Sequence, residues 1–133
     1  MGMTEHEMAV ELMKWARYHM KKYPFLELFH HVANEGKRNP RIAKSEGMLA
    51  GLPDYHLPVA TDDGLYSGFW LELKAPSKRP PVKQLRMIEL LSDYGNYASW
   101  TDNLQDAIST IEWYCKKVTG ELFTMRSKEV PNE

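Results

Sequence analysis

Hydrophobic and polar positions alternate with two different periods along the chain, and each period predicts a type of element. Apolar residues that recur every three or four positions are typical of amphipathic helices. This spacing predicts helices from Thr4 to about Lys22, from about Val82 to Tyr94 and from about Asn103 to Lys117. Thr4 and Glu7 have the spacing of a capping box. A shorter helix is expected over residues 41–47, because Asn39-Pro40 is a favourable helix start.

Four other segments are apolar or alternate every second residue, which favours strands. They cover residues 25–33, 54–59, 66–74 and 97–101. The predicted order is helix, strand, strand, strand, helix, strand, helix. This order indicates an α/β domain with a mixed sheet flanked by helices. We expect one domain over residues 1–119 and a polar tail over residues 120–133.

The charge is nearly balanced overall but unevenly distributed. The net charge is −1, yet residues 37–44 and 74–86 contain basic side chains and no acidic ones. Two basic stretches in a neutral chain favour binding of a polyanion on one face. The alternative is that they are ordinary solvated surface charges.

The cysteine content and the hydropathy favour a reducing cytoplasm. Cys115 is the only cysteine, so no intrachain disulfide and no cysteine-based metal site is expected. No apolar run approaches the length of a membrane span, and the N-terminal residues lack the layout of a secretory signal.

The candidate chemistry lies between Gly51 and Lys74. Asp54 follows Pro53, and Glu72 and Lys74 are two residues apart in a predicted strand. Side chains two apart on a strand project from the same face, so Glu72 and Lys74 are expected to point the same way. Two carboxylates beside an ammonium group suit a Mg²⁺ ion that activates water for hydrolysis of an anionic ester.

A longer motif surrounds these residues and resembles a known family. It consists of Gly47-x-x-x-Gly51-x-Pro53-Asp54, then Gly68-Phe69-Trp70-Leu71-Glu72-Leu73-Lys74-Ala75-Pro76, and then Gln84. It resembles the virus-type replication-repair nuclease (VRR-NUC) domain, a branch of the PD-(D/E)XK nuclease superfamily. The resemblance extends from Glu5 to about Tyr114 and implies a restriction-endonuclease-like fold.

The resemblance also implies roles for individual residues. It implies that Glu5, Asp54 and Glu72 bind Mg²⁺ or Mn²⁺ and that Lys74 is the catalytic lysine. It also implies that Gln84 can reach the active site or the DNA backbone. The family often has glutamine four residues after its first-helix acid, where this chain has Ala9, so Glu7 is the alternative to Glu5. The turn Asn34-Glu35-Gly36-Lys37-Arg38 matches an Asn-x-Gly-x-Arg turn of the family. The residues expected to bind DNA phosphates are Lys37, Arg38, Lys78, Arg79, Lys83 and Arg86.

The implied activity is endonucleolytic hydrolysis of DNA. Stand-alone members of this family are associated with phages. The resemblance implies that such members are homodimers that can cut branched DNA such as four-way (Holliday) junctions. The cytoplasm would be that of the host if the protein is phage-encoded. An alternative is a DNA-binding or scaffolding module that keeps the fold without hydrolysis. A third reading, an endonuclease with sequence preference, predicts one dominant cut in plain duplex DNA.

Several other residues have both a structural and a functional interpretation. His30 and His31 are adjacent on a predicted strand, so at most one can approach the site, and a structural role is expected for both. A packing role is also expected for His56 and Trp70, and Tyr94 is expected in the core.

Overall fold

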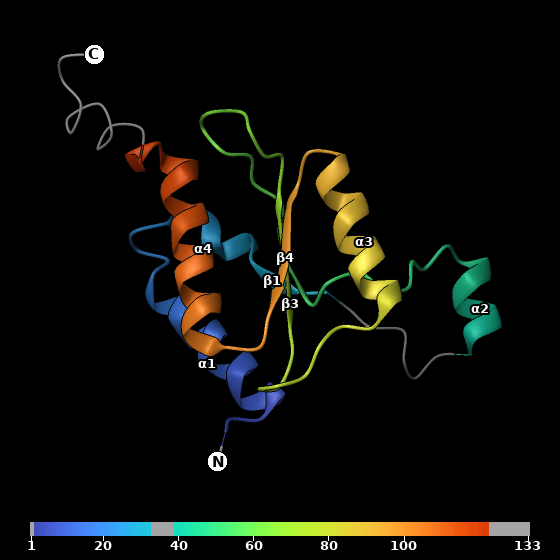
Figure 1. Cartoon of the computed structure of the whole chain (residues 1–133). Coiled ribbons are helices and arrows are strands. Elements are labelled where there is room, and N and C mark those ends of the chain that lie inside the picture. The colour runs from blue at the N-terminus through green and yellow to red at the C-terminus, as the bar shows by residue number, and fades with distance from the viewer. Residues whose placement is uncertain (1, 33–38, 123–133) are drawn as a thin grey trace.

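A computed structural model describes residues 2–32 and 39–122 and shows a sheet with helices on both faces (Figure 1). The predicted turn with Lys37 and Arg38 lies outside these residues, as does most of the predicted tail. The elements in chain order are α1 (Glu5–Tyr18), the 3₁₀ helix η1 (Pro24–Leu28), β1 (His30–His31), α2 (Pro40–Ser45), β2 (Tyr55–Leu57), β3 (Phe69–Leu73), α3 (Val82–Asp93), β4 (Tyr97–Thr101) and α4 (Leu104–Thr119).

The four strands form one mixed sheet in the order β1-β2-β3-β4. The β1–β2 and β2–β3 pairs are antiparallel, and β3 pairs with β4 in parallel. The parallel pair is joined through α3, as a parallel connection requires a crossover. Helices α1 and α4 cover one face of the sheet, and α3 lies on the other face (Figure 1). The predicted α/β class and the mixed sheet are therefore confirmed.

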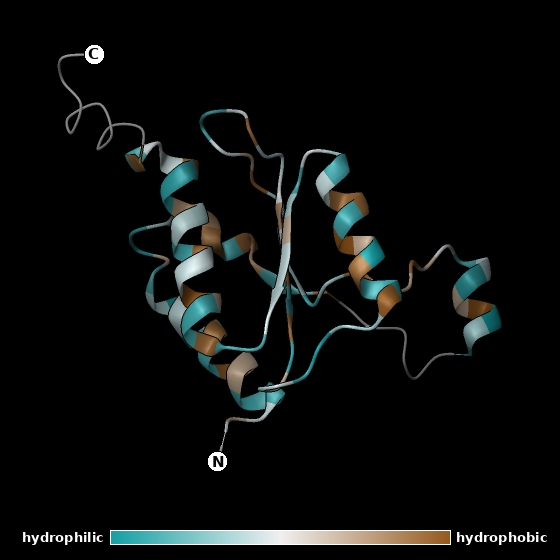
Figure 2. Cartoon of the chain, in the orientation of Figure 1, coloured by the Kyte–Doolittle hydropathy of each residue, from teal (hydrophilic) through white to brown (hydrophobic). Residues whose placement is uncertain are grey.

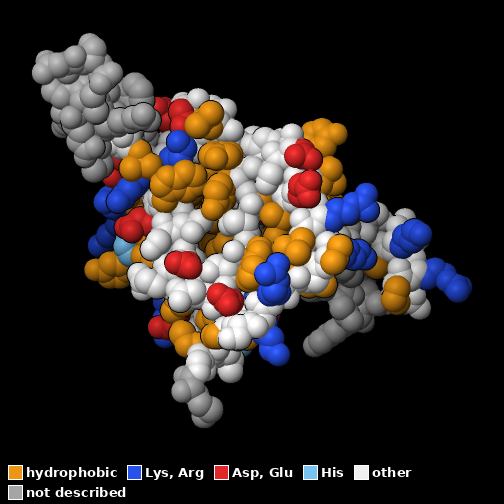
Figure 3. Space-filling model, in the orientation of Figure 1, with side chains coloured by type: hydrophobic (Ala, Val, Ile, Leu, Met, Phe, Trp, Pro, Cys, Tyr) orange, Lys and Arg blue, Asp and Glu red, His pale blue; other side chains and the backbone are white. Residues whose placement is uncertain are grey.

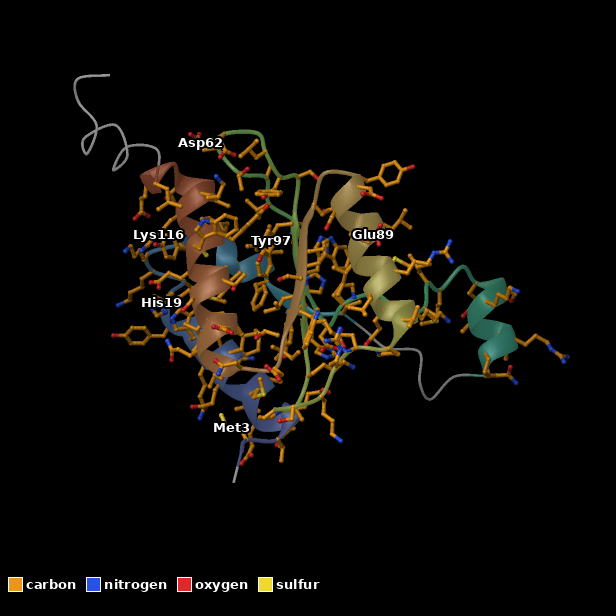
Figure 4. All side chains as sticks on the ribbon, viewed as in Figure 1. Met3, His19, Asp62, Glu89, Tyr97 and Lys116 are labelled. Carbon is orange, nitrogen blue, oxygen red and sulfur yellow. The ribbon has the colours of Figure 1, made fainter. Side chains whose placement is uncertain are left out.

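The hydrophobic core lies between the sheet and the α1–α4 pair. Strand β3 contributes Phe69, Leu71 and Leu73, which share one face because side chains alternate along a strand. Tyr97 projects from β4 toward α4 (Figure 4) and packs on Trp113 of that helix with ring centroids 5.1 Å apart. Both helices carry interspersed hydrophobic and hydrophilic residues (Figure 2). Their buried residues are Met8, Leu12 and Ala16 in α1 and Ala107, Ile111, Tyr114 and Cys115 in α4.

Helix α1 begins as predicted but ends earlier. The Thr4 side chain accepts from the Glu7 N–H, and the Glu7 carboxylate accepts from the Thr4 N–H, which completes the capping box. The helix was expected to reach Lys22 but ends at Tyr18. His19 caps it, with its ring Nδ1 2.8 Å from the Trp15 carbonyl oxygen, and the following turn directs Tyr23 into the core.

The prediction of a strand over residues 25–33 is wrong for most of that segment. Residues 24–28 form η1, and among residues 25–32, the described part of the segment, only His30 and His31 are in a strand. Tyr23, Leu26 and Phe29 are all buried. A three-residue burial interval fits the three residues per turn of a 3₁₀ helix, and Pro24 has the backbone angle that starts it.

Helix α3 lies where predicted but is not buried. Residues 85, 87, 88 and 91 were expected in the core, and all four are only half-buried. Tyr94, also predicted in the core, is 80 % exposed. The helix covers mainly β4, and much of its outer surface faces solvent. Gly95 follows it with a positive φ of 94°, the left-handed conformation expected after a helix.

The remaining helices agree closely with the predictions. Asn39 caps α2 by accepting from the Arg41 N–H, and α4 ends at Thr119 with Gly120 in the left-handed conformation. Within residues 2–32 and 39–122, no helix is long and apolar enough to cross a membrane.

Candidate active site

The candidate site forms where β2 and β3 separate. Their last backbone pair is Tyr55 with Leu71, and Pro53 has no N–H with which to extend the ladder. Beyond this pair, side chains accept the hydrogen bonds between the two segments. The Asp54 N–H donates to Glu72 Oε1 and the Leu73 N–H donates to Asp54 Oδ2, both at 3.0 Å. Each carboxylate is thereby held by the backbone of the other strand, which fixes the two acids side by side.

Glu72 is an unusual residue because it is a carboxylate in the protein interior. Its exposed fraction is 2 %. Burial raises the pKa of Glu72, and the nearby charge of Asp54 raises it further. The Lys74 ammonium acts in the opposite direction, with Nζ 3.0 Å from Glu72 Oε2. A buried acid beside a second acid is costly for folding, so this arrangement indicates a functional site.

Gln84 reaches the same group from the first turn of α3. Its side-chain hydrogen bond to Glu72 lowers the pKa of that acid. Its Oε1 is buried and has no hydrogen-bond partner in the part of the chain that the structure describes. A buried amide oxygen without a partner is rare and is well placed to accept from a water or substrate group.

This donor set suits a hard divalent cation. Asp54 Oδ1 is not used in the Asp54–Leu73 hydrogen bond, and Gln84 Oε1 offers another oxygen. Mg²⁺ commonly takes one or two protein carboxylates and fills its other positions with water and phosphate oxygens. Among residues 2–32 and 39–122, however, no three His, Cys, Asp or Glu side chains form a ready metal cluster. Asp54 and Glu72 supply the one or two carboxylates that Mg²⁺ commonly takes from a protein.

The structure places Glu5, rather than Glu7, beside this site. Glu5 and Asp54 line the same cavity, of about 230 Å³, between the start of α1 and the strands. Burial, together with the charges of Asp54 and Glu5, raises the pKa of Tyr55 to about 12. Glu7 is occupied in the capping box, and its hydrogen bonds to Thr4 lower its pKa.

The predicted DNA-binding residues in the described part of the chain are exposed. Lys78 and Arg79 lie in the loop after β3, and Lys83 and Arg86 lie on the first half of α3. The Arg79 guanidinium lies 5.6 Å from the centre of the Trp100 ring. Figure 3 shows Lys and Arg side chains gathered on the side where α2 and the start of α3 lie. That side can attract a polyanion, although the chain as a whole is nearly neutral.

The histidines separate to opposite faces of the sheet. His30 lies edge-on to His56, which stacks on Trp70 at 3.7 Å between ring centroids. Burial and His30 lower the pKa of His56. His31 instead lines the cavity with Glu5 and Asp54. Strand alternation allows one of His30 and His31 to approach the site, but which of them does so depends on the register between β1 and β2.

The comparison with solved structures supports this architecture, whereas two other comparisons found no match. No protein-family model matches the sequence, and no curated protein matches it. A solved structure described as a "VRR_NUC domain protein" matches with a TM-score of 0.73 and 29 % sequence identity. The match covers 87 % of this chain and 91 % of that one. The chain therefore has the restriction-endonuclease-like fold of the VRR-NUC domain, and the resemblance found in its sequence is confirmed.

Proposed function

We propose that this protein is a metal-dependent endonuclease that hydrolyses DNA phosphodiester bonds. The observation that carries the proposal is the hydrogen-bonded pair of Asp54 and Glu72, with Lys74 in contact with the buried acid. The structural similarity to a VRR-NUC domain supports a nuclease of that type. Without a function, a buried Glu72 beside the half-buried Asp54 would reduce stability and gain nothing.

The proposed roles follow from the geometry. Asp54 and Glu72, with Glu5 as the further candidate ligand, would hold Mg²⁺ or Mn²⁺. A bound divalent ion would polarise the phosphate and lower the pKa of an attacking water. Lys74 places a positive charge beside Glu72, where it can orient that water and offset negative charge that develops on the phosphate. The free Oε1 of Gln84 can accept a hydrogen bond from the same water.

DNA binding is assigned to the exposed basic residues. Lys83 and Arg86 lie on the first half of α3, and Lys78 and Arg79 lie in the loop that leads to it. The predicted Lys37–Arg38 turn, which is outside the described residues, is assigned the same role. Lys and Arg contacts to phosphates give affinity that depends on salt and not on sequence. We therefore favour structure-selective cutting of branched DNA over sequence-selective cutting.

A homodimer is proposed as the assembly, with the second half of α3 as a contact surface. Leu90 on α3 is 46 % exposed and Tyr94, which directly follows the helix, is 80 % exposed, although both are large and hydrophobic. A two-fold contact at this surface would leave the basic first half of α3 available to DNA. Two active sites related by a two-fold axis suit the two symmetric strands of a four-way junction.

We place the protein in a reducing cytoplasm, that of the host if it is phage-encoded. Its single thiol, Cys115, is fully buried, and burial raises the pKa of Cys115 to about 12. A protonated, buried thiol does not form disulfides, so the fold does not need an oxidising compartment.

The experiment is cleavage of a labelled four-way junction and of a linear duplex with the same arm sequences. Each is incubated with the purified protein and Mg²⁺, Mn²⁺ or EDTA. The proposal expects cutting with metal only, and faster cutting of the junction. Equal rates on both substrates would remove the branched-DNA selectivity, and one dominant cut in the duplex would indicate sequence preference. Binding without cutting under every metal condition would establish the alternative, an inactive DNA-binding module.

A further inference from the structure

The cavity beside Asp54 contains more than carboxylates. It is lined by residues from α1, from the end of β1, from the start of β2 and from the end of β3, among them Glu5, His6, His31, Asp54, Tyr55 and Leu73. Its volume, about 230 Å³, is enough for a phosphate group with a few waters. A phosphodiester that entered it would lie close to two negatively charged side chains. The proposed divalent cation would offset part of that repulsion, and hydrogen-bond donors to the phosphate oxygens would offset more of it.

His31 is positioned to be such a donor. It pairs with Tyr55 across β1 and β2, and its ring lies edge-on to the Tyr55 ring, with centroids 5.2 Å apart and planes at 89°. This packing fixes the direction of the imidazole along the cavity wall. The side chain is nevertheless exposed, and β1 is the terminal strand of the sheet, so a DNA backbone can approach from the open edge.

His30 provides a natural comparison on the same strand. It points to the opposite face of the sheet, since adjacent residues of a strand alternate. Its ring contacts His56 at 5.6 Å, and its Nδ1 lies 2.9 Å from the Leu28 carbonyl oxygen. The two histidines therefore lie on the same strand and are both exposed, but of the two only His31 lines the cavity.

We infer that His31 binds the substrate by donating an imidazole N–H to a non-bridging phosphate oxygen in the cavity beside Asp54. The inference rests on the proposed function, because it assigns a contact to the DNA of that reaction. A neutral imidazole has one N–H and can make this contact without changing its charge. The contact explains how a cavity lined by Glu5 and Asp54 can admit a phosphodiester.

The test compares His31→Phe, His31→Gln and His30→Phe with the parent protein. Phenylalanine at position 31 keeps an aromatic ring against Tyr55 but has no N–H, whereas glutamine lacks the ring and keeps an N–H donor. Two quantities are measured: the affinity for a labelled DNA in Ca²⁺ or EDTA, and kcat/KM for cleavage in Mg²⁺. Thermal unfolding is followed for each variant, so that a loss of folding is recognised.

We expect His31→Phe to lower kcat/KM about tenfold or more, as is typical of hydrogen bonds to charged groups, and to weaken DNA binding. His31→Gln should recover part of the loss, and His30→Phe should behave as the parent. The inference is overturned if a folded His31→Phe cleaves and binds as the parent does, or if His30→Phe loses as much. If His31→Phe does not fold, folded His31→Gln is compared with His30→Phe instead. Equal losses of DNA affinity and kcat/KM in these two variants, or no loss in either, overturn the inference.

Failure of the proposed function gives a different pattern. If the parent cuts no DNA with any metal, the nuclease proposal fails, and the binding measurements alone decide the role of His31. Weaker binding by His31→Phe than by His30→Phe then supports the contact. Equal binding by the two variants, or no binding by the parent, overturns it.

Discussion

At the scale of single residues, the site depends on two acids that replace part of a backbone ladder. Asp54 receives the Leu73 N–H, and Glu72 receives the Asp54 N–H. These hydrogen bonds fix the carboxylates without using all of their oxygens. The same side chains thus support the local structure and remain available to a cation, and the two roles can be separated by substitution.

Asp54→Asn is expected to separate them. Asparagine keeps an oxygen that can accept from the Leu73 N–H, and it removes the charge that raises the pKa of Glu72. The free energy of unfolding should therefore stay within about 1 kcal/mol of the parent value or increase. Cleavage should fall about a hundredfold or more. Urea unfolding and single-turnover cleavage measure the two effects, and full activity in the variant would contradict the role of Asp54.

The stability of the metal-free protein should also depend on the protonation of Glu72. Because the pKa of Glu72 is raised in the folded state, the folded protein retains a proton that the unfolded chain has lost. Stability should therefore fall as the pH rises above the ordinary value of 4.5. Glu72→Gln should remove this part of the slope in urea unfolding between pH 4.5 and 7. An unchanged slope would show that the buried acid does not titrate in this way.

Some residues of the site can be predicted from local sequence patterns, and others cannot. Glu72 and Lys74 are two apart on one strand, so strand geometry alone predicts that they share a face. Gln84 and Glu5 were assigned only through the family resemblance, and the structure brings Gln84 to Glu72 and Glu5 to the cavity with Asp54. The position of His31 depends on pairing between strands distant in sequence, so no local pattern contains it.

At the scale of elements, helix α1 forms one wall of the cavity beside Asp54. Its first turn carries Glu5 and His6, and the capping box at Thr4 sets where that turn begins. Start signals of this kind depend on residues close in sequence and were predicted correctly. The end of α1 and the turn η1 were not, because burial of Tyr23, Leu26 and Phe29 in the core overrides local strand preference.

Thr4→Ala tests the importance of this start. It removes the hydroxyl oxygen that accepts from the Glu7 N–H, and loss of such a cap typically costs about 1 kcal/mol of stability. The free energy of unfolding in urea is the measurement. Ser109→Ala, at an exposed position inside α4, is the control and should change stability little. Equal effects of the two substitutions would mean that the cap does not stabilise α1.

At the scale of the whole molecule, the two faces of the sheet are covered unequally. One face is buried under α1 and α4, whereas none of the described residues of α3 is fully buried. The sequence predicted α3 but not its exposure, because an amphipathic pattern shows which residues face inward and not how completely they are covered. The apolar side chains left exposed on α3 are the reason for the proposed dimer surface.

Light scattering with two tyrosine variants tests that surface. Tyr94, directly after α3, is 80 % exposed, and Tyr18, at the end of α1, is 82 % exposed. We expect a dimeric parent, a monomeric Tyr94→Glu variant and a dimeric Tyr18→Glu variant, since a charge at the centre of an apolar contact opposes association. A monomeric parent would contradict the dimer, and a dimeric Tyr94→Glu variant would place its contact elsewhere.

The central claim is that Asp54, Glu72 and Lys74 form a hydrolytic site, and cleavage by Lys74→Ala tests it most directly. Parent, Lys74→Ala and Lys21→Ala, an exposed lysine far from the motif in sequence, are compared on a labelled four-way junction with Mg²⁺ or Mn²⁺. The account predicts cutting by the parent and by Lys21→Ala, and a loss of about a hundredfold or more in Lys74→Ala with DNA binding retained. Cleavage by Lys74→Ala at the parental rate, or no metal-dependent cleavage by the parent, would contradict it.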